Sequence, residues 1–187
     1  MKPVAYVALI AVATLLAGTA FAQDTYIGLS RATPGEAYVD FATAKHVRNY
    51  NSPVALKVYG GVNLTAHYGI EVGYGDFGSL RTANPTVGST EEVRMASTLF
   101  YAAGTGRMPV SESFSLFGKL GLASNKFTID PNFQASSSTS SVRQMLGFGA
   151  DVKFTKHLSA VLEFNYYGTA GKTFKQQKLE TGLKYAF

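Results

Sequence analysis

Three short motifs in the chain combine residue types that can do chemistry. His157-Leu-Ser159, followed by Glu163, offers a base, a hydroxyl and an acid, the set that activates a serine oxygen for acyl transfer. Gly73-Tyr-Gly-Asp-Phe-Gly78 matches the letters of a dinucleotide-binding loop, and Gly171-Lys-Thr173 resembles the end of a phosphate-binding loop. Each motif works only in the right structural setting, so the surrounding elements decide which of them can function.

The sequence lacks the structural elements that nucleotide binding and metal binding require. A dinucleotide loop lies between a strand and a helix, whereas the Gly73 motif stands between a strand end and a loop. The earlier glycine of a phosphate loop would fall at Tyr166, and no helix follows. The histidines His46, His67 and His157 show no metal-ligand spacing, and the chain has no cysteine. We therefore expect no cofactor and no metal site.

Alternation of apolar and polar side chains is the dominant pattern of the chain. In the last segment Leu183, Tyr185 and Phe187 alternate with a set that includes Glu180 and Lys184, which is the period of a β-strand with two different faces. Eight segments of this kind are predicted as strands: Thr25–Arg31, Val54–Val62, Tyr68–Gly75, Glu91–Ala103, Phe114–Ala123, Ser141–Lys153, Leu158–Tyr167 and Gln177–Phe187. In the fourth of them we expect Leu99 and Tyr101 on the apolar outer face, with Tyr101 in a girdle of aromatic residues near the strand ends, and Phe100 on the inner face.

The strand lengths and connections favour a membrane barrel. Most segments are about as long as a tilted strand needs to cross hydrocarbon. Short connections (63–67, 104–113 and 154–157) alternate with longer polar ones (32–53, 76–90, 124–140 and 168–176), as periplasmic turns alternate with outer loops. A soluble β-sandwich or lipocalin-like barrel would place its charges outside, but here the polar face is rich in glycine, which suits a cramped interior. We predict an all-β, eight-stranded antiparallel up-and-down transmembrane β-barrel.

The first 22 residues have the composition of an export signal. Lys2 is the only charge, Val4–Leu16 is a short apolar run, and Ala20-Phe-Ala22 gives the small-x-small pattern of a cleavage site. An uncleaved anchor helix is the alternative. We expect a signal peptide over 1–22, a barrel domain over 23–187, and localisation in the cell outer membrane.

Several segments resemble the outer membrane protein A-like family of small barrels. The resemblance is carried by Leu56-Lys-Val-Tyr-Gly-Gly-Val-Asn63, by Gly147-Phe-Gly-Ala-Asp-Val-Lys-Phe154, and by the closing pattern of Gly182, Tyr185 and Phe187. It implies a Gram-negative cell envelope and an assembly signal in the closing pattern that the barrel insertion machinery reads. Larger members carry a peptidoglycan-binding domain that this chain lacks, so a cell-wall tether is not implied.

An eight-stranded barrel has an interior that side chains can fill, which argues against a general porin. Its inward positions carry charges of both signs, and such charges persist only when they are paired. We therefore predict a lumen charge network that plugs the barrel, formed by Lys57, Glu71, Arg94, Lys119, Arg143, Glu163, Glu180 and Lys184. A fixed polar core and a switchable gate both remain open for this network.

The predicted function is structural or surface interaction of an adhesion type, without catalysis. The outer loops are the candidates for binding a host or surface ligand, and lipids and lipopolysaccharide surround the wall. The net charge of +5 is mild and indicates no nucleic acid. The alternatives are a narrow ion-conducting channel and a lipid A-modifying enzyme. Some eight-stranded barrels are lipid A deacylases, but His157 falls at a periplasmic turn, far from the leaflet that holds lipid A.

Overall fold

The computed structural model describes residues 24–32, 37–40, 46–49, 55–83, 92–131, 137–170 and 174–187. The strands in that part are β1 Asp24–Ala32, β2 Ala37–Asp40, β3 His46–Asn49, β4 Ala55–Asn63, β5 Tyr68–Ala83, β6 Glu92–Pro109, β7 Phe114–Pro131, β8 Ser137–Lys153, β9 Leu158–Ala170 and β10 Phe174–Ala186. Over these residues the structure has no helix long and apolar enough to span a membrane. The predicted signal peptide and Gly171-Lys-Thr173 lie outside them.

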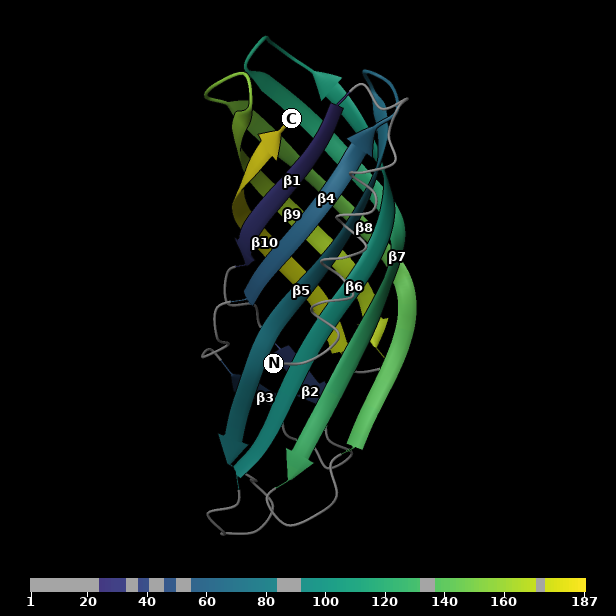
Figure 1. Ribbon diagram of the computed structural model, residues 1–187. Coiled ribbons are helices and arrows are strands. Elements are labelled where there is room, and N and C mark those ends of the chain that lie inside the picture. The colour runs from purple at the N-terminus through teal and green to yellow at the C-terminus, as the bar shows by residue number, and fades with distance from the viewer. Residues whose placement is uncertain are drawn as a thin grey trace.

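Eight of the strands form one closed antiparallel barrel (Figure 1). Around the barrel the order is β1-β10-β9-β8-β7-β6-β5-β4, so neighbours in sequence are neighbours in space and β1 closes the sheet between β4 and β10. Leu29 on β1 lies opposite Val58 on one side and Leu183 on the other. Strands β2 and β3 form a separate two-stranded sheet inside the predicted loop 32–53. The predicted barrel is confirmed, and the additional hairpin was not foreseen.

The barrel has its apolar face outside and its charged face inside. On β7 the Lys119 residue is 5% exposed while the adjacent Leu120 is 64% exposed. On β8 the Phe148 residue is 64% exposed while Asp151 is 1% exposed. A soluble protein has the reverse arrangement, so the alternation indicates a wall that faces hydrocarbon.

The facing predicted for one strand is wrong. On β6 the prediction placed Leu99 and Tyr101 on the lipid side and Phe100 inside. Leu99 and Tyr101 are buried in the interior, at 1% and 0% exposure, and Phe100 is 43% exposed. The reason is that both faces of this strand carry large apolar residues, so the alternation itself does not say which face turns inward. Tyr101 therefore belongs to the core and not to an aromatic girdle.

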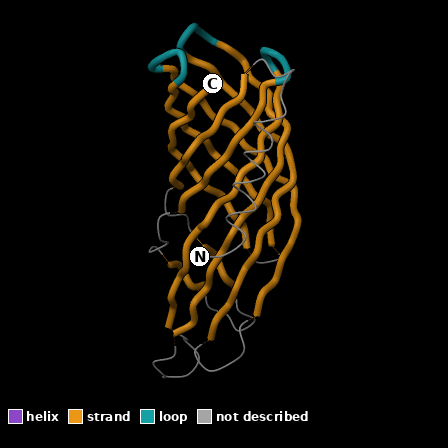
Figure 2. The backbone as a smooth tube through the Cα atoms, in the orientation of Figure 1, coloured by secondary structure: helices purple, strands orange, loops and turns teal. Residues whose placement is uncertain are grey.

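Three tight turns lie at the same end of the barrel as the C-terminus (Figure 2). They connect β4 to β5, β6 to β7 and β8 to β9, and we call this end the turn end. Each turn folds its backbone in the same way. In the last of them Phe154 N and Thr155 N both donate to Leu158 O, at 2.9 and 3.2 Å. The hydroxyl oxygen of Thr155 then accepts from the N–H groups of His157 and Leu158.

The wall is much taller on one side than on the other. Strands β5 to β8 contain 16 to 18 residues, whereas β1 and β4 contain nine. The long strands run past their shorter neighbours at the end away from the turns, which we call the loop end (Figure 1). The predicted loops 76–90 and 124–140 therefore begin with strand, a correction to the sequence-based boundaries.

Candidate functional site

Five charged side chains from five strands meet inside the barrel, and we call them the lumen network. Lys57 Nζ on β4 lies 3.1 Å from Glu163 Oε2 on β9 and also pairs with Glu180 on β10. Lys119 Nζ on β7 lies 2.6 Å from Glu71 Oε1 on β5 and 2.8 Å from Glu163 Oε1. Glu163 therefore joins both lysines, and the network spans the interior from wall to wall.

Hydroxyl groups add hydrogen bonds to two of the three carboxylates in the lumen network, Glu71 and Glu180. Tyr26 and Tyr101 donate to the two oxygens of Glu71, at 2.9 and 2.5 Å. Tyr167 donates to Glu180 Oε1 at 2.6 Å. These tyrosines are at most 7% exposed. A buried carboxylate is tolerated when its lone pairs are satisfied, so the tyrosines and lysines together make the ionised lumen stable.

Glycine makes room for this crowded interior. Gly28 lies opposite Tyr59 in the β1–β4 pairing, and a Cβ at Gly28 would overlap the Tyr59 ring. The ring thus lies flat over the glycine and reaches the lysines: Lys57 Nζ and Lys119 Nζ lie 5.2 and 5.1 Å from its centroid. Cations at this distance are attracted by the face of an aromatic ring.

A second cluster, the turn-end cluster, lies nearer the turns. Asp151 on β8 accepts from Arg107 Nη2 at 2.8 Å and from Lys184 Nζ at 2.5 Å. Arg107 Nη2 also donates to Ser115 Oγ at 3.1 Å. With the lumen network, these side chains place four cations against four carboxylates in the described interior: Lys57, Arg107, Lys119 and Lys184 against Glu71, Asp151, Glu163 and Glu180.

The space left between the two clusters is small. A cavity of about 30 Å³ is bounded by side chains of both, among them Tyr59, Arg107 and Lys184. The hydroxyl of Tyr59 and Nε of Arg107 have no protein partner among the described residues. A polar cavity of this size suits a few ordered water molecules.

Six of the eight residues predicted for the lumen lie in these clusters, and two do not. The side chain of Arg94 lies outside the described residues. Arg143 was predicted to join the lumen network, but its side chain is exposed and has no ion pair with the described network. The pairing between β8 and β9 ends at Leu146 and Tyr166, so Arg143 lies beyond the paired part of these two strands.

Sequence reasoning missed two kinds of participant. Arg107 was placed in a connection, because its surroundings are rich in glycine and lack alternation. Tyr101 was assigned to the lipid face, and Tyr26 and Tyr167 were given no role. A tyrosine suits either face of a barrel wall, so nothing in the sequence marks a tyrosine that bonds a buried carboxylate.

The structure does not assemble the serine motif. Ser159 is buried on β9, but His157 lies in the turn that precedes it, where Nδ1 lies 2.8 Å from Ala186 O and the ring stacks on Tyr185 at 5.7 Å. Glu163 is engaged by two lysines. The three side chains thus serve different partners.

The dinucleotide-like motif and the histidines can be placed only as far as the described residues allow. The motif Gly73-Tyr-Gly-Asp-Phe-Gly78 lies wholly within β5, with no helix after it in the described chain. The described residues contain no group of histidine and acidic side chains that could hold a metal ion.

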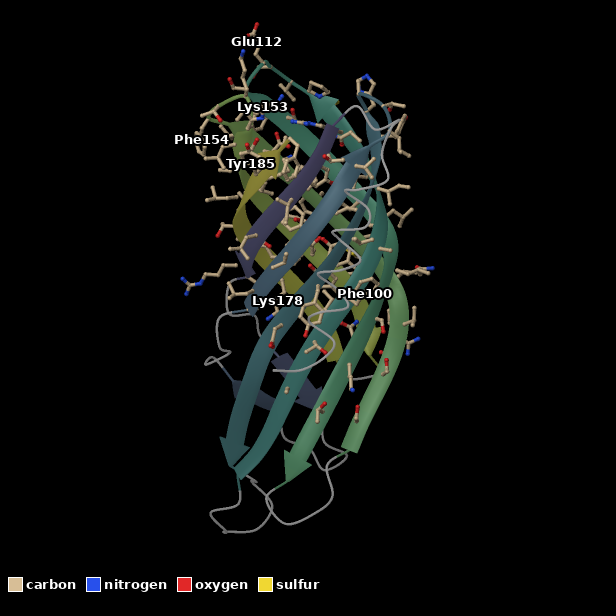
Figure 3. The ribbon with its side chains drawn as sticks, viewed as in Figure 1. Phe100, Glu112, Lys153, Phe154, Lys178 and Tyr185 are labelled. Atoms are coloured by element: carbon tan, nitrogen blue, oxygen red, sulfur yellow. The ribbon has the colours of Figure 1, made fainter. Side chains whose placement is uncertain are left out.

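The closing residues lie at the turn end, on the outer surface. Tyr185 and Phe187 are 45% and 61% exposed, and their rings meet edge to face at 5.3 Å. Phe187 N donates to Thr25 O at 3.0 Å, which fastens the end of the chain to β1. Figure 3 shows Tyr185 at this end together with Phe154 and Glu112, while Phe100 and Lys178 lie farther toward the loop end.

Solved structures of small barrels are similar to this chain. Ail of Yersinia pestis, in complex with the heparin analogue sucrose octasulfate, is 14% identical with a TM-score of 0.62, over 88% of this chain and 98% of that one. The N-terminal barrel of OprF from Pseudomonas aeruginosa is 12% identical with a TM-score of 0.61, over 89% and 98%. Neisserial surface protein A is 14% identical with a TM-score of 0.58, over 87% and 97%. At these identities the likeness shows the fold.

Sequence comparison assigns the family. No curated protein matches the chain. The family model of the outer membrane protein beta-barrel domain matches residues 8–187. The chain therefore belongs to the outer membrane protein beta-barrel domain family, as a closed eight-stranded barrel with an ion-paired lumen.

Proposed function

We propose that this protein is a non-catalytic outer-membrane barrel whose role is interaction at the cell surface, with a lumen plugged by its charged side chains. The observation that carries the proposal is the division of the molecule into two parts. The interior is filled by paired charges, and β5 to β8 run past the shorter strands at the loop end. The filled interior leaves no path for solutes, and the long strands provide a surface for binding.

The plug follows from the energetics of the lumen network. A path through the barrel would require Lys57 or Lys119 to leave carboxylates that are otherwise buried, at 1 to 2% exposure. Breaking a buried pair costs about 3–5 kcal/mol, so the closed state dominates. Recording across a planar bilayer should therefore give no steady conductance of porin size. Such a conductance from the purified protein would refute the plug.

The orientation in the envelope is part of the proposal. With short turns in the periplasm, as in other outer-membrane barrels, the long strands and the segments between them face the outside. We further infer that residues 1–22 are removed on export, that Gly182, Tyr185 and Phe187 contact the insertion machinery during assembly, and that lipids and lipopolysaccharide surround the wall. The intact mass of the protein from outer membranes tests the cleavage, since it should correspond to a chain that begins at Gln23.

The surface ligand can be sought first among sulfated sugars. Ail, whose fold is similar, was solved with a heparin analogue, and this chain carries a net charge of +5. Liposomes containing the protein should bind immobilised heparin. A variant with Lys45, Arg48 and Lys126 changed to glutamine should lose that binding, because it removes cations of the loop 32–53 and of β7 toward the loop end. Lys156→Gln at a periplasmic turn should keep it. Equal binding by the triple variant and the wild type would contradict a role for the loop end.

A further inference from the structure

A cleft opens in the outer wall of the barrel where β8 and β9 part. The pairing of the two strands ends at Leu146 and Tyr166, although β8 continues on the β7 side back to Ser137. The cleft has a volume of about 440 Å³, within the range of small-molecule sites. It is lined by Leu122, Val142, Arg143, Gln144, Tyr166 and Gly168.

The cleft lies at the border of the apolar band that is nearer the loop end. On β8 the outward residues Phe148 and Leu146 are 64% and 54% exposed, and Gln144 and the 60% exposed Val142 follow. On β7 the outward Leu122 is 57% exposed, and Ser124 and the exposed Lys126 follow. Polar residues thus enter the outward face here, where Gln144 lies opposite Leu122 and Ser124 lies opposite Val142. Such mixing suits the level at which a bilayer changes from acyl chains to headgroups.

Arg143 brings an exposed positive charge to this border. Its side chain is exposed, and no hydrogen bond or ion pair holds it among the described residues. Its stem packs against Gly168 on β9, where a Cβ would lie 2.5 Å from Arg143 Cβ. Gly168 has φ of +79°, a conformation that glycine adopts without strain. The glycine thus lets the arginine stem lie across the gap between the strands.

We propose that this cleft binds a phosphorylated lipid of the outer leaflet. The acyl chain lies along Leu122, Val142 and Tyr166, and the headgroup phosphate receives hydrogen bonds from the Arg143 guanidinium, whose planar fork fits phosphate oxygens. Gln144 adds an amide donor beside it. The proposal rests on the orientation inferred above, in which the loop end faces outward. The apolar lining, open toward the hydrocarbon, selects a lipid over a free anion.

Lipid retention by the intact protein tests the site. The full chain is placed in phosphatidylcholine nanodiscs that contain a small fraction of diphosphoryl lipid A. Native mass spectrometry then measures the fraction of protein that keeps one bound lipid A when it is released from the nanodisc. Because an exposed ion pair contributes up to about 1 kcal/mol, Arg143→Gln should reduce retention by up to about fivefold. Lipid A stripped of phosphate should bind wild type and Arg143→Gln equally.

The matched control is Arg31, an exposed arginine on the outward alternation of β1 that lines no part of the cleft. Arg31→Gln should retain lipid A like the wild type, and heat-modified migration on a gel shows that each variant is folded. Equal retention by Arg143→Gln and wild type would overturn the proposal, and so would an equal loss in Arg31→Gln.

Inorganic phosphate should not shift the amide resonances of Gln144 and Gly168; saturation by phosphate alone would show an anion site instead. Arg143→Gln should still bind heparin. The lipid site can therefore fail its test while the proposed surface role stands, and the reverse.

Discussion

At the scale of single residues, Glu163 is the link that makes the lumen one unit. Its two oxygens face two lysines, 3.1 Å from Lys57 Nζ and 2.8 Å from Lys119 Nζ. Lys57 in turn pairs with Glu180. The loss of either lysine therefore leaves a carboxylate short of a cation in a space that water hardly enters.

Lys57→Met is expected to lower the free energy of unfolding by about 3–5 kcal/mol, because Glu163 and Glu180 lose their shared cation and stay buried without it. Urea titration in detergent micelles, followed by tryptic digestion or tyrosine fluorescence, measures the change. Adding Glu180→Gln should recover part of the loss, since it removes one of the stranded charges. Lys156→Met, at an exposed turn, should stay within about 0.5 kcal/mol of the wild type.

Gly168 is the second residue whose identity the backbone dictates. Gly168→Ala should cost about 1–3 kcal/mol, since alanine is strained at φ of +79° and its methyl group would press on Arg143. Gly106→Ala is the control, because a Cβ there meets nothing within 4 Å. Urea midpoints of the two variants compare them directly. Equal midpoints would mean that β9 can straighten at no cost.

A lipid A assay addresses Ser159 at the same scale. Ser159 is buried at 5% exposure, and His157 is held by Ala186 O and Tyr185. Incubation of the protein with lipopolysaccharide should leave the mass of lipid A unchanged, with wild type and Ser159→Ala alike. Release of an acyl chain by the wild type that Ser159→Ala abolishes would establish an enzyme.

At the scale of elements, one turn design is used three times. Leu64, Val110 and Phe154 each donate their N–H to the carbonyl four residues on. The residue that follows each of them is Thr65, Ser111 or Thr155, and its hydroxyl oxygen accepts from the N–H that begins the next strand. The hydroxyl thus satisfies backbone donors that the reversal of the chain leaves over.

Thr155→Ala should therefore destabilise the β8–β9 hairpin by about 1 kcal/mol, as the loss of a capping hydroxyl does elsewhere. Thr155→Ser should restore the wild-type value because it keeps the oxygen. Amide hydrogen exchange of His157 and Leu158 in micelles reports on the turn itself. Unchanged exchange in Thr155→Ala would show that the hydroxyl contributes nothing.

The elements also show how far the sequence predicts the structure. Strand positions within the apolar band follow from alternation, as the facing of Lys119 and Leu120 illustrates. The extension of β8 back to Ser137 could not be predicted, because a strand outside the bilayer has water on both faces and loses its alternation. The facing of β6 failed for the opposite reason, since Leu99, Phe100 and Tyr101 are large and apolar on both faces. Arg143 lies beyond the last β8–β9 pair, which alternation alone could not predict.

At the scale of the whole molecule, closure of the sheet supplies the stability that this cysteine-free chain needs. Every strand of the barrel has a neighbour on each side, so the backbone groups within the apolar band are paired without water. The protein should therefore stay folded in sodium dodecyl sulfate at room temperature and run faster unboiled than boiled, in the outer-membrane fraction. Identical migration before and after boiling would contradict a closed barrel of this stability.

The pairing of four cations with four carboxylates among the described residues has a consequence for the evolution of the barrel. A mutation that removes one charge leaves its partner unpaired in the buried interior, whereas a second mutation that removes or exchanges the partner restores the balance. Divergent descendants of this chain should therefore change Lys57 together with Glu180, or Arg107 together with Asp151, while their lipid-facing leucines and valines drift one at a time.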